Sequence, residues 1–450
     1  MVPPDTIAAI ATAPGRGAIG IIRVSGPKVP TLARELLGVV PAPRSATFAR
    51  FLDADGSAID AGVALYFPAP ASFTGEHVLE LQGHGGAVVL DLLMRRVLAL
   101  GCRAALAGEF SERAFVNGKL DVVQAEAIAD LINAGTDAAA RAAVRSMRGE
   151  FSARIEALQQ RLTELRKLVE AAIDFPDEEI DFASHASLDR RLQEIAADFG
   201  GITAAARQGA LLREGLNVVI AGKPNAGKSS LLNRLAGEEI AIVAALPGTT
   251  RDVLRQSLQV DGLTVNLVDT AGLRSTDDVI EAEGVRRARG EMQKADLVLY
   301  LIDAAADVSA ETHAAPLDDL PAGVPVVLVI NKIDLLGSSA RIDAGVAPVQ
   351  IHLSAKSGDG LELLRTHLKQ LAGYQSADGG ALSARRRHLD ALTRAWGYVN
   401  EGAQNFSSAR ALELFAEDLR LAQDSLSEIT GDFGSEELLG EIFRSFCIGK

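Results

Sequence analysis

The sequence predicts a mixed α/β domain at the N-terminus, followed by a helical bundle that carries a second, doubly wound α/β domain as an insertion. Three observations support this fold class: strand-like apolar segments come first, bundle-type helical patterns flank the middle, and strands alternate with helices between them. At 450 residues the chain exceeds what one hydrophobic core supports. The predicted divisions are 1–118, 119–214, 215–374 and 375–450.

The N-terminal domain is predicted from three strand-like segments and one helix. Ile19–Val24, Ala61–Phe67 and His77–Leu81 have the apolar, β-branched pattern of strands. Gly83–Gly86 then forms a turn into an apolar helix over Val88–Leu100.

The helical domain is predicted from two seams of apolar residues at three- and four-residue steps. The first seam ends before Pro176, and the second follows a linker over 372–380. A lone helical tail cannot bury such a stripe, so the second seam is expected to pack against the helices before residue 211, with the α/β unit inserted between them. The seams are Ile155, Leu158, Leu162, Leu165, Val169 and Ala172, and Leu412, Phe415, Leu419, Ala422, Leu426 and Ile429.

The charge balance makes general attraction of a polyanion unfavourable. The chain has 45 basic and 59 acidic residues and a formal net charge of −14, so RNA binding would need a local basic patch or a basic partner. The dense basic run Arg385–Arg387 is interpreted as the exposed start of a helix, with an RNA or partner contact as the alternative. The acidic run Asp174–Asp181 is interpreted as a solvated turn rather than a metal site.

The cysteine content and the N-terminus predict a soluble cytoplasmic protein. Cys102 and Cys447 are the two cysteines, too few for a disulfide framework. The first residues lack the basic start and apolar core of a signal peptide, and no apolar run reaches membrane-spanning length.

A phosphate-binding loop follows the first strand of the inserted domain. The buried-strand run Leu216–Ala221 leads into Gly222–Ser229, which has the pattern G-x-x-x-x-G-K-S before a helix. Backbone N–H groups of such a loop surround phosphates, and the helix N-terminus adds partial positive charge. Lys228 is predicted to reach the β- and γ-phosphates, and the Ser229 hydroxyl to bind Mg²⁺.

Two further segments complete the predicted phosphate and magnesium site. Leu263–Asp269 alternates like a strand and ends in Asp269-Thr-Ala-Gly272. Asp269 is predicted to hold Mg²⁺ through water, and the Gly272 N–H to sense the γ-phosphate. In Gly248-Thr-Thr250, Thr250 is the predicted second magnesium ligand.

The identity of the base is predicted by Asn331-Lys-Ile-Asp334, which follows the buried strand Val326–Ile330. A carboxylate at Asp334 can accept both N–H donors of the guanine Watson–Crick edge, which adenine lacks. Ser354-Ala-Lys356 follows a further strand and would give the guanine oxygen a backbone N–H. These elements in this order predict a GTPase.

The hydrolysis mechanism is predicted to depart from that of Ras-like enzymes. Leu273 stands where those enzymes place a water-orienting Gln. The side-chain oxygen of Asn225 could hold a monovalent cation beside the phosphates, where it would stabilise transition-state charge. Glu281 is a candidate for orienting water, with an exposed acid at a helix start as the alternative.

The whole chain resembles the tRNA-modification GTPase MnmE (TrmE) family. The resemblance is carried by segments outside the general GTPase motifs, namely Asp5–Ala8, Gly20–Gly26, Gly75–Gly86, Gly108–Asp121 and Phe446–Lys450. A GTPase unit inserted into a helical domain, giving a Ras-like P-loop G domain between two helical parts, is also the architecture of this family.

The resemblance implies binding sites and partners. It implies an N-terminal folate-binding and dimerisation domain, with a tetrahydrofolate derivative (5-formyl- or 5,10-methylene-tetrahydrofolate) at Arg23, Glu80, Lys119 and Lys450. It further implies a homodimer, an FAD-dependent partner protein, and tRNA whose wobble uridine receives an aminomethyl or carboxymethylaminomethyl group at C5. Cys447 remains open between a nucleophile and a packing role.

The resemblance also implies a K⁺ site and assigns Glu281 as the residue that orients water. The implied K⁺ ligands are Asn225, Ala244, Leu246 and Thr249, and the predicted catalytic residues are Lys228, Thr250 and Glu281. The predicted GTP contacts are Asn225, Ala226, Gly227, Lys228, Ser229, Ser230, Ala244, Ala245, Leu246, Pro247, Gly248, Thr249, Thr250, Asp269, Thr270, Ala271, Gly272, Asn331, Lys332, Asp334, Ser354, Ala355 and Lys356.

Two other functions fit a GTPase of this size. A ribosome- or RNA-associated assembly switch would be expected to carry a basic RNA-binding appendage, whereas the C-terminal region here is helical and carries acidic residues. A folate-dependent transferase with an idle GTPase unit would predict no loss of product when Lys228 or Asp269 is changed.

Overall fold

The structure, a computed structural model, forms two compact units. Unit 1 comprises residues 1–132, 144–202 and 390–450, and unit 2 comprises 133–143 and 203–389. The described residues are 5–174, 185–238, 255–260, 262–269, 295–306, 324–374, 380–409, 411–431, 436–444, 446 and 449.

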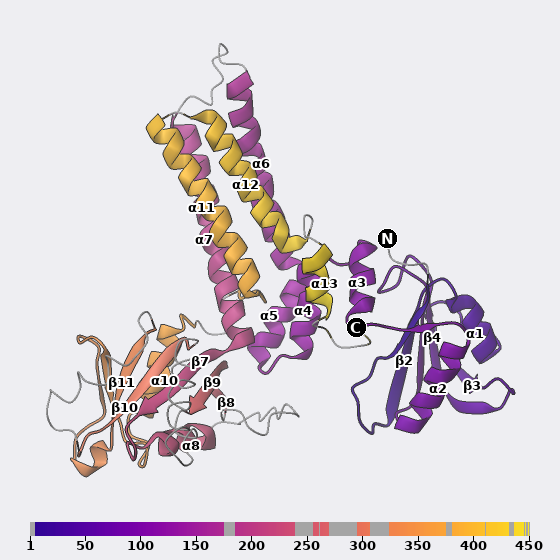
Figure 1. Cartoon of the computed structure of the whole chain (residues 1–450), viewed down its shortest axis with the longest axis horizontal. Coiled ribbons are helices and arrows are strands. Elements are labelled where there is room, and N and C mark those ends of the chain that lie inside the picture. The colour runs from indigo at the N-terminus through magenta and orange to yellow at the C-terminus, as the bar shows by residue number, and fades with distance from the viewer. Residues whose placement is uncertain are drawn as a thin grey trace, which may run out of the picture. The chain divides into compact units, whose positions relative to one another are not determined.

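The N-terminal part of unit 1 is a six-stranded sheet in the order β3-β4-β5-β2-β1-β6 (Figure 1). Its neighbours are antiparallel except for β1 and β6, which are parallel. The three predicted strands are present as β2, β4 and β5, and the predicted helix as α2. The elements are β1 Ile7–Ile10, β2 Ile19–Ser25, α1 Val29–Leu37, β3 Thr47–Leu52, β4 Ala58–Phe67, β5 Val78–His84, α2 Ala87–Ala99 and β6 Arg103–Ala104.

The two faces of this sheet have different roles. Alternate residues of β2 and β5, among them Val24 and Leu79, are fully buried in a core with α1 and α2. The residues between them point to the opposite face, because side chains alternate along a strand. Arg23 of β2 and Glu80 of β5 are paired in register on that opposite face.

The rest of unit 1 consists of long packed helices. The predicted packing of the C-terminal seam against the earlier helices is confirmed, because α12 lies along α6 (Figure 1). Both seams are buried except for the partly exposed Ala172 and Leu412 at their ends. The helices are α3 Glu109–Val116, α4 Val122–Ile132, α5 Asp137–Met147, α6 Glu150–Asp174, α7 His185–Glu214, α11 Arg386–Ala409, α12 Leu412–Thr430 and α13 Glu436–Arg444, with α5, α7 and α11 crossing the unit boundaries.

Polar contacts accompany the apolar seam between α6 and α12. Gln159 donates to the Ser427 hydroxyl at 2.8 Å, and Arg166 donates to Gln423 at 2.8 Å.

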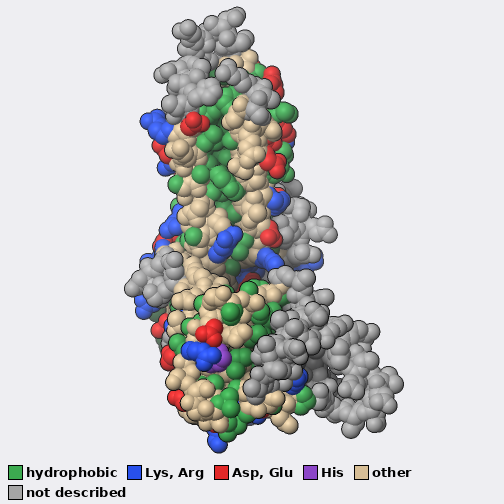
Figure 2. Space-filling view, turned by 90° about the vertical axis from the view of Figure 1, so that its left-hand side faces the viewer, with side chains coloured by type: hydrophobic (Ala, Val, Ile, Leu, Met, Phe, Trp, Pro, Cys, Tyr) green, Lys and Arg blue, Asp and Glu red, His purple; other side chains and the backbone are tan. Residues whose placement is uncertain are grey.

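Figure 2 shows hydrophobic side chains running along the long helices, with charged side chains on both borders. Within the described ranges, every helix falls short of the length or apolarity that crossing a bilayer demands.

The last helix brings the C-terminal residues to the N-terminal sheet. Phe443 and Phe446 are buried in a cluster with α4. A Cβ on Gly108 would lie 2.3 Å from the Phe443 carbonyl oxygen, so only glycine admits this approach. Gly449 lies at the end of β1. A Cβ on Gly449 would lie 2.7 Å from the Ile10 carbonyl oxygen.

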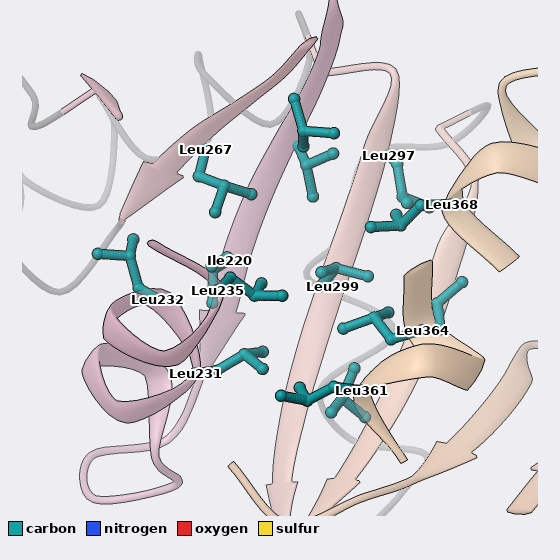
Figure 3. Close-up of a cluster of buried hydrophobic side chains, with 14 of the residues drawn as sticks. Ile220, Leu231, Leu232, Leu235, Leu267, Leu297, Leu299, Leu361, Leu364 and Leu368 are labelled. Carbon is teal, nitrogen blue, oxygen red and sulfur yellow. The ribbon is translucent and has the colours of Figure 1, made fainter. Parts of the chain in front are cut away.

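Unit 2 is built on a seven-stranded sheet in the order β12-β13-β11-β10-β7-β9-β8. The pairs are parallel except at the two edges, which matches the predicted doubly wound pattern. Helices α8 and α10 bury leucines against β7, β9 and β10 on one face (Figure 3). The elements are β7 Leu216–Gly222, α8 Lys228–Glu238, β8 Arg255–Val260, β9 Leu263–Asp269, β10 Leu297–Asp303, β11 Val326–Asn331, the 3₁₀ helix η4 Ile333–Leu335, β12 Arg341–Asp343, β13 Val349–His352 and α10 Leu361–Leu371.

Candidate functional site

The predicted phosphate loop lies between β7 and α8, at the carboxyl end of the parallel strands. Three of its residues have positive φ: Gly222 at 141°, Asn225 at 65° and Gly227 at 99°. A Cβ on Gly222 would lie 2.4 Å from the Leu301 carbonyl oxygen, so the loop passes close to β10. Such a left-handed turn at a helix start exposes consecutive N–H groups, which is the arrangement that holds phosphates.

Lys228 is folded back over this loop. Its Nζ donates to the carbonyl oxygens of Gly222 at 2.8 Å and Lys223 at 2.9 Å, and the residue is 9% exposed. Ser229 follows on the first turn of α8 and is exposed. The loop therefore presents a lysine and a hydroxyl at the same helix start.

Asn331 joins the phosphate loop to the segment that follows β13. The buried side chain donates through Nδ2 to the Ala226 carbonyl oxygen at 2.8 Å, and its Oδ1 accepts from the Ala355 N–H at 2.9 Å. A Cβ on Gly227 would lie 2.1 Å from Asn331 Nδ2, so the loop needs glycine there. Three segments far apart in the sequence are thus held together by one side chain.

Asp334 is exposed and is tied to the same segments. The Ser354 hydroxyl donates to Asp334 Oδ1 at 2.7 Å, and the Ser357 N–H donates to the Ser354 hydroxyl at 3.1 Å. These bonds orient the Asp334 carboxylate. The arrangement can accept two parallel N–H donors from a planar base.

Asp303 is a further residue at the Asn331–Asp334 motif, and the sequence patterns did not identify it. Its carboxylate Oδ2 lies 2.5 Å from Nζ of Lys332, the second residue of the Asn331-Lys-Ile-Asp334 motif. A signal was present in the sequence, because Asp303 ends the buried strand that precedes β11.

Several predicted nucleotide and metal contacts lie outside the described residues. Asp269 ends β9, and its side chain is likewise outside the description. The structure therefore leaves their roles as predictions. The predicted residues outside the described ranges are Ala244, Ala245, Leu246, Pro247, Gly248, Thr249, Thr250, Thr270, Ala271, Gly272 and Glu281, as well as Leu273.

A second polar cluster lies in unit 1, on the face of the sheet opposite α1 and α2. Arg23 donates through Nε to Glu80 Oε1 at 3.0 Å and through Nη1 to the Gly449 carbonyl oxygen at 3.3 Å. The guanidinium carbon lies 5.8 Å from the centre of the Phe73 ring and 5.9 Å from that of Phe110. Phe110 is fully buried, whereas Phe73 is 37% exposed. A charged pair beside an exposed aromatic ring can bind a flat polar heterocycle.

Two of the four predicted folate residues, Arg23 and Glu80, form this cluster. Lys119 is exposed, and a Cβ on Gly75 would lie 3.3 Å from its Cε, close in sequence to Phe73. Lys450 and Cys447 lie outside the described residues. The neighbour of Lys450, Gly449, reaches Arg23 directly.

A buried arginine supports the loop that carries Phe73. Arg113 is fully buried and contacts three carboxylates: Asp5 at 2.7 Å, Glu109 at 2.9 Å and Glu76 at 3.1 Å. The Ser25 hydroxyl in turn donates to Glu76 Oε2 at 2.7 Å. This network ties the loop to β2 and α3.

The basic run at the start of α11 is only partly available to a ligand. Arg386 is exposed, whereas Arg385 and Arg387 are half-buried. The neighbouring His388 is buried, and its Nδ1 accepts from the Arg385 N–H at 3.0 Å. The interpretation of the basic run 385–387 as the start of a helix is confirmed, because α11 begins at Arg386.

The parallel sheet, the phosphate loop and the tied Asn331 and Asp334 define a P-loop GTP-binding protein. Family sequence models match two parts of the chain: residues 122–447 match the MnmE helical domain, and residues 6–119 match the N-terminus of the GTP-binding protein TrmE. The chain belongs to the MnmE family of tRNA modification GTPases.

Full-length relatives agree with this assignment. A protein of Thiobacillus denitrificans named tRNA modification GTPase MnmE is 57% identical over 447 residues, covering 99% of this chain and 98% of its own. A protein of the same name from Sodalis glossinidius is 56% identical over 450 residues, covering 99% of both chains. The chain is a GTP hydrolase with a TrmE-type N-terminal domain and an MnmE-type helical domain.

Proposed function

We propose that this chain is a potassium-activated GTPase that acts with an FAD-dependent partner on tRNA. The pair would add an aminomethyl or carboxymethylaminomethyl group to C5 of the wobble uridine, with the one-carbon unit supplied by a tetrahydrofolate derivative. The observation that supports the proposal is the presence of two hydrogen-bonded polar clusters in a chain of this family. One is the pocket around Asn331 and Asp334, and the other is the Arg23–Glu80 cluster that Gly449 reaches.

The Arg23 cluster fits a folate. Glu80 is a carboxylate acceptor for the N–H edge of a pterin, and Arg23 is a donor for its oxygens or for the glutamate tail. The Phe73 ring, 37% exposed, provides an apolar surface of the kind that a pterin needs. Lys119 and Lys450 are proposed to meet the anionic tail.

The nucleotide pocket fits GTP with Mg²⁺ and K⁺. Ser229 stands exposed at the helix start, where its hydroxyl would hold Mg²⁺ together with Thr250. Asn225 is also exposed, so its amide oxygen is available as a K⁺ ligand. A bound K⁺ would supply the transition-state charge that Ras-like enzymes obtain from an arginine.

A homodimer is proposed through the face of the N-terminal sheet opposite α1 and α2. Register places Phe48, Val63 and Ile19 on the same face as Arg23. Phe48 is 76% exposed and Ile19 is 62% exposed. Large exposed apolar side chains on one sheet face are typical of an interface, and a second copy of the chain is the proposed occupant.

The function is tested by mass spectrometry of tRNA nucleosides from cells that lack this chain. Wild-type protein should restore the modified wobble uridine, whereas Lys228→Ala should not, and Arg23→Ala should restore less of it. Purified Arg23→Ala should bind 5-formyl-tetrahydrofolate about tenfold more weakly, because a charged hydrogen-bond donor is lost. Arg34→Ala, on the exposed side of α1, is the control. Normal wobble uridine in the deleted cells would overturn the proposal and favour an assembly role.

GTP turnover should be roughly tenfold to a hundredfold faster in K⁺ than in Na⁺ at equal ionic strength. The reason is that a group that stabilises transition-state charge typically changes kcat by about this factor. Asn225→Ala should abolish the difference while GDP binding survives. Asn225 has a φ of 65°, which alanine adopts at a cost, so Asn225→Gly is the matched variant. Equal wild-type rates in both salts, or K⁺ activation that persists in Asn225→Gly, would rule out this cation site.

A further inference from the structure

Asp303 is preorganised at the edge of the base pocket. It ends β10 and pairs in register with Asn331 of β11. Its Oδ1 accepts from the Ala305 N–H at 3.0 Å, which leaves Oδ2 directed at Lys332 Nζ, 2.5 Å away. The Asp303 side chain is 20% exposed and the Lys332 side chain 30%, so the pair is shielded from water more than most surface ion pairs.

Lys332 is constrained on both sides in the chain. Its own φ is 69°, a left-handed conformation that is uncommon outside glycine. Asn331 before it is held by Ala226 and Ala355, and Asp334 after it is held by Ser354. The backbone is therefore set, and the remaining freedom lies in the four-carbon side chain, whose end Asp303 holds.

We propose that Asp303 is a positioning residue of the guanine pocket, holding the Lys332 ammonium so that the methylene stem stays over the plane of the bound base. The inference rests on the proposed pocket around Asp334. A free lysine side chain loses much rotamer entropy when it is ordered by a ligand. With the side chain already ordered by Asp303, that entropy loss no longer opposes nucleotide binding.

The charge state of Asp303 agrees with this role. The hydrogen bond from Lys332 lowers the pKa of the Asp303 carboxyl and outweighs burial, which acts in the opposite direction. The backbone N–H groups of Ala305 and Ala306 lower the pKa further. The carboxylate is therefore ionised at neutral pH and attracts the ammonium.

Asp303→Asn should bind GDP about fivefold to tenfold more weakly, because GDP must then order the long Lys332 side chain itself. The KM for GTP should rise by the same factor while kcat is unchanged, because Lys332 would act on the base and not on the phosphates. Asp303→Glu keeps the charge and should retain most of the affinity. In the Lys332→Ala background, Asp303→Asn should have no further effect, since the two residues act through one contact.

The control is Asp343→Asn, at the sheet edge in the same unit, where Asp343 pairs with Arg341 and His352. This variant should bind GDP like the wild type. If Asp303→Asn bound GDP as tightly as the wild type, or if the effects of Asp303→Asn and Lys332→Ala were additive, the role of Asp303 would be overturned but the pocket would stand. Failure of wild-type protein to bind GDP, or an unaltered base preference in Asp334→Asn, would overturn the pocket itself and this inference with it.

Discussion

Asp334→Asn is expected to weaken GDP and GTP binding by roughly a hundredfold to a thousandfold and to shift the preference towards xanthine nucleotides. The wild-type carboxylate, oriented by the Ser354 hydroxyl at 2.7 Å, can accept from two guanine N–H donors. An asparagine has one acceptor and presents N–H donors to the guanine amino group. Loss of two charge-assisted hydrogen bonds, each worth about 1.5–3 kcal/mol, accounts for the size of the effect.

The measurement is the displacement of a fluorescent guanine nucleotide by GDP and by xanthosine diphosphate. Xanthine carries a carbonyl where guanine has its amino group, so it can accept from the new asparagine amide. Asp343→Asn serves again as the control, because its contacts are confined to the sheet edge. An unchanged ratio of the two affinities would show that Asp334 does not read the base.

Arg113→Ala is expected to destabilise the N-terminal domain by about 3–5 kcal/mol, because it removes one member of a buried ionic network. Arg113 is fully buried, and the Glu109 side chain is only 8% exposed. Without the guanidinium, the buried Glu109 and the partly buried Glu76 would keep charges that are less well compensated. Urea unfolding followed by hydrogen exchange in β1, β2 and β5 would locate the loss.

The matched control for this change is Arg95→Ala on α2. Arg95 pairs with Asp91 at 2.6 Å, but both side chains are more than half exposed. Such a pair contributes about 0–1 kcal/mol. A similar loss in both variants would show that burial of Arg113 is not the source of its effect.

The same network predicts how the stability depends on pH. Burial raises the pKa of Asp5 and of Glu109, but hydrogen bonds from Arg103 and Arg113 outweigh it, so both lie below their ordinary values of 3.8 and 4.5. Carboxyls with depressed pKa values contribute stability that is complete above the unfolded values and is lost as the pH falls through the folded ones. The wild-type domain should therefore weaken below about pH 4, and Arg113→Ala should flatten this dependence.

Much of the fold could be predicted because its signals are local. The strands β2, β4 and β5 and the helix α2 follow from apolar periodicity, and the buried α6 and α12 seams follow from three- and four-residue steps. The short strands β1 and β3 and the helix α1 were not assigned from the sequence. The two strands give no long periodic run, and their pairing partners lie elsewhere in the chain. The helix α1 does carry a helical apolar pattern, in Val29, Leu32, Ala33, Leu36 and Leu37, so its signal was present in the sequence.

What the sequence determined by itself is the local structure of the phosphate-loop segment and the packing of the two helical seams. The phosphate loop is a contiguous strand–loop–helix segment, and Asn331 and Asp334 follow directly on a buried strand. What only the tertiary structure decided are the contacts between distant residues: Asp303 with Lys332, Arg113 with its carboxylates, and Arg23 with Gly449, 426 residues later. The physical reason is that such pairs depend on strand register and helix packing, which bring residues together without leaving a pattern in the local sequence.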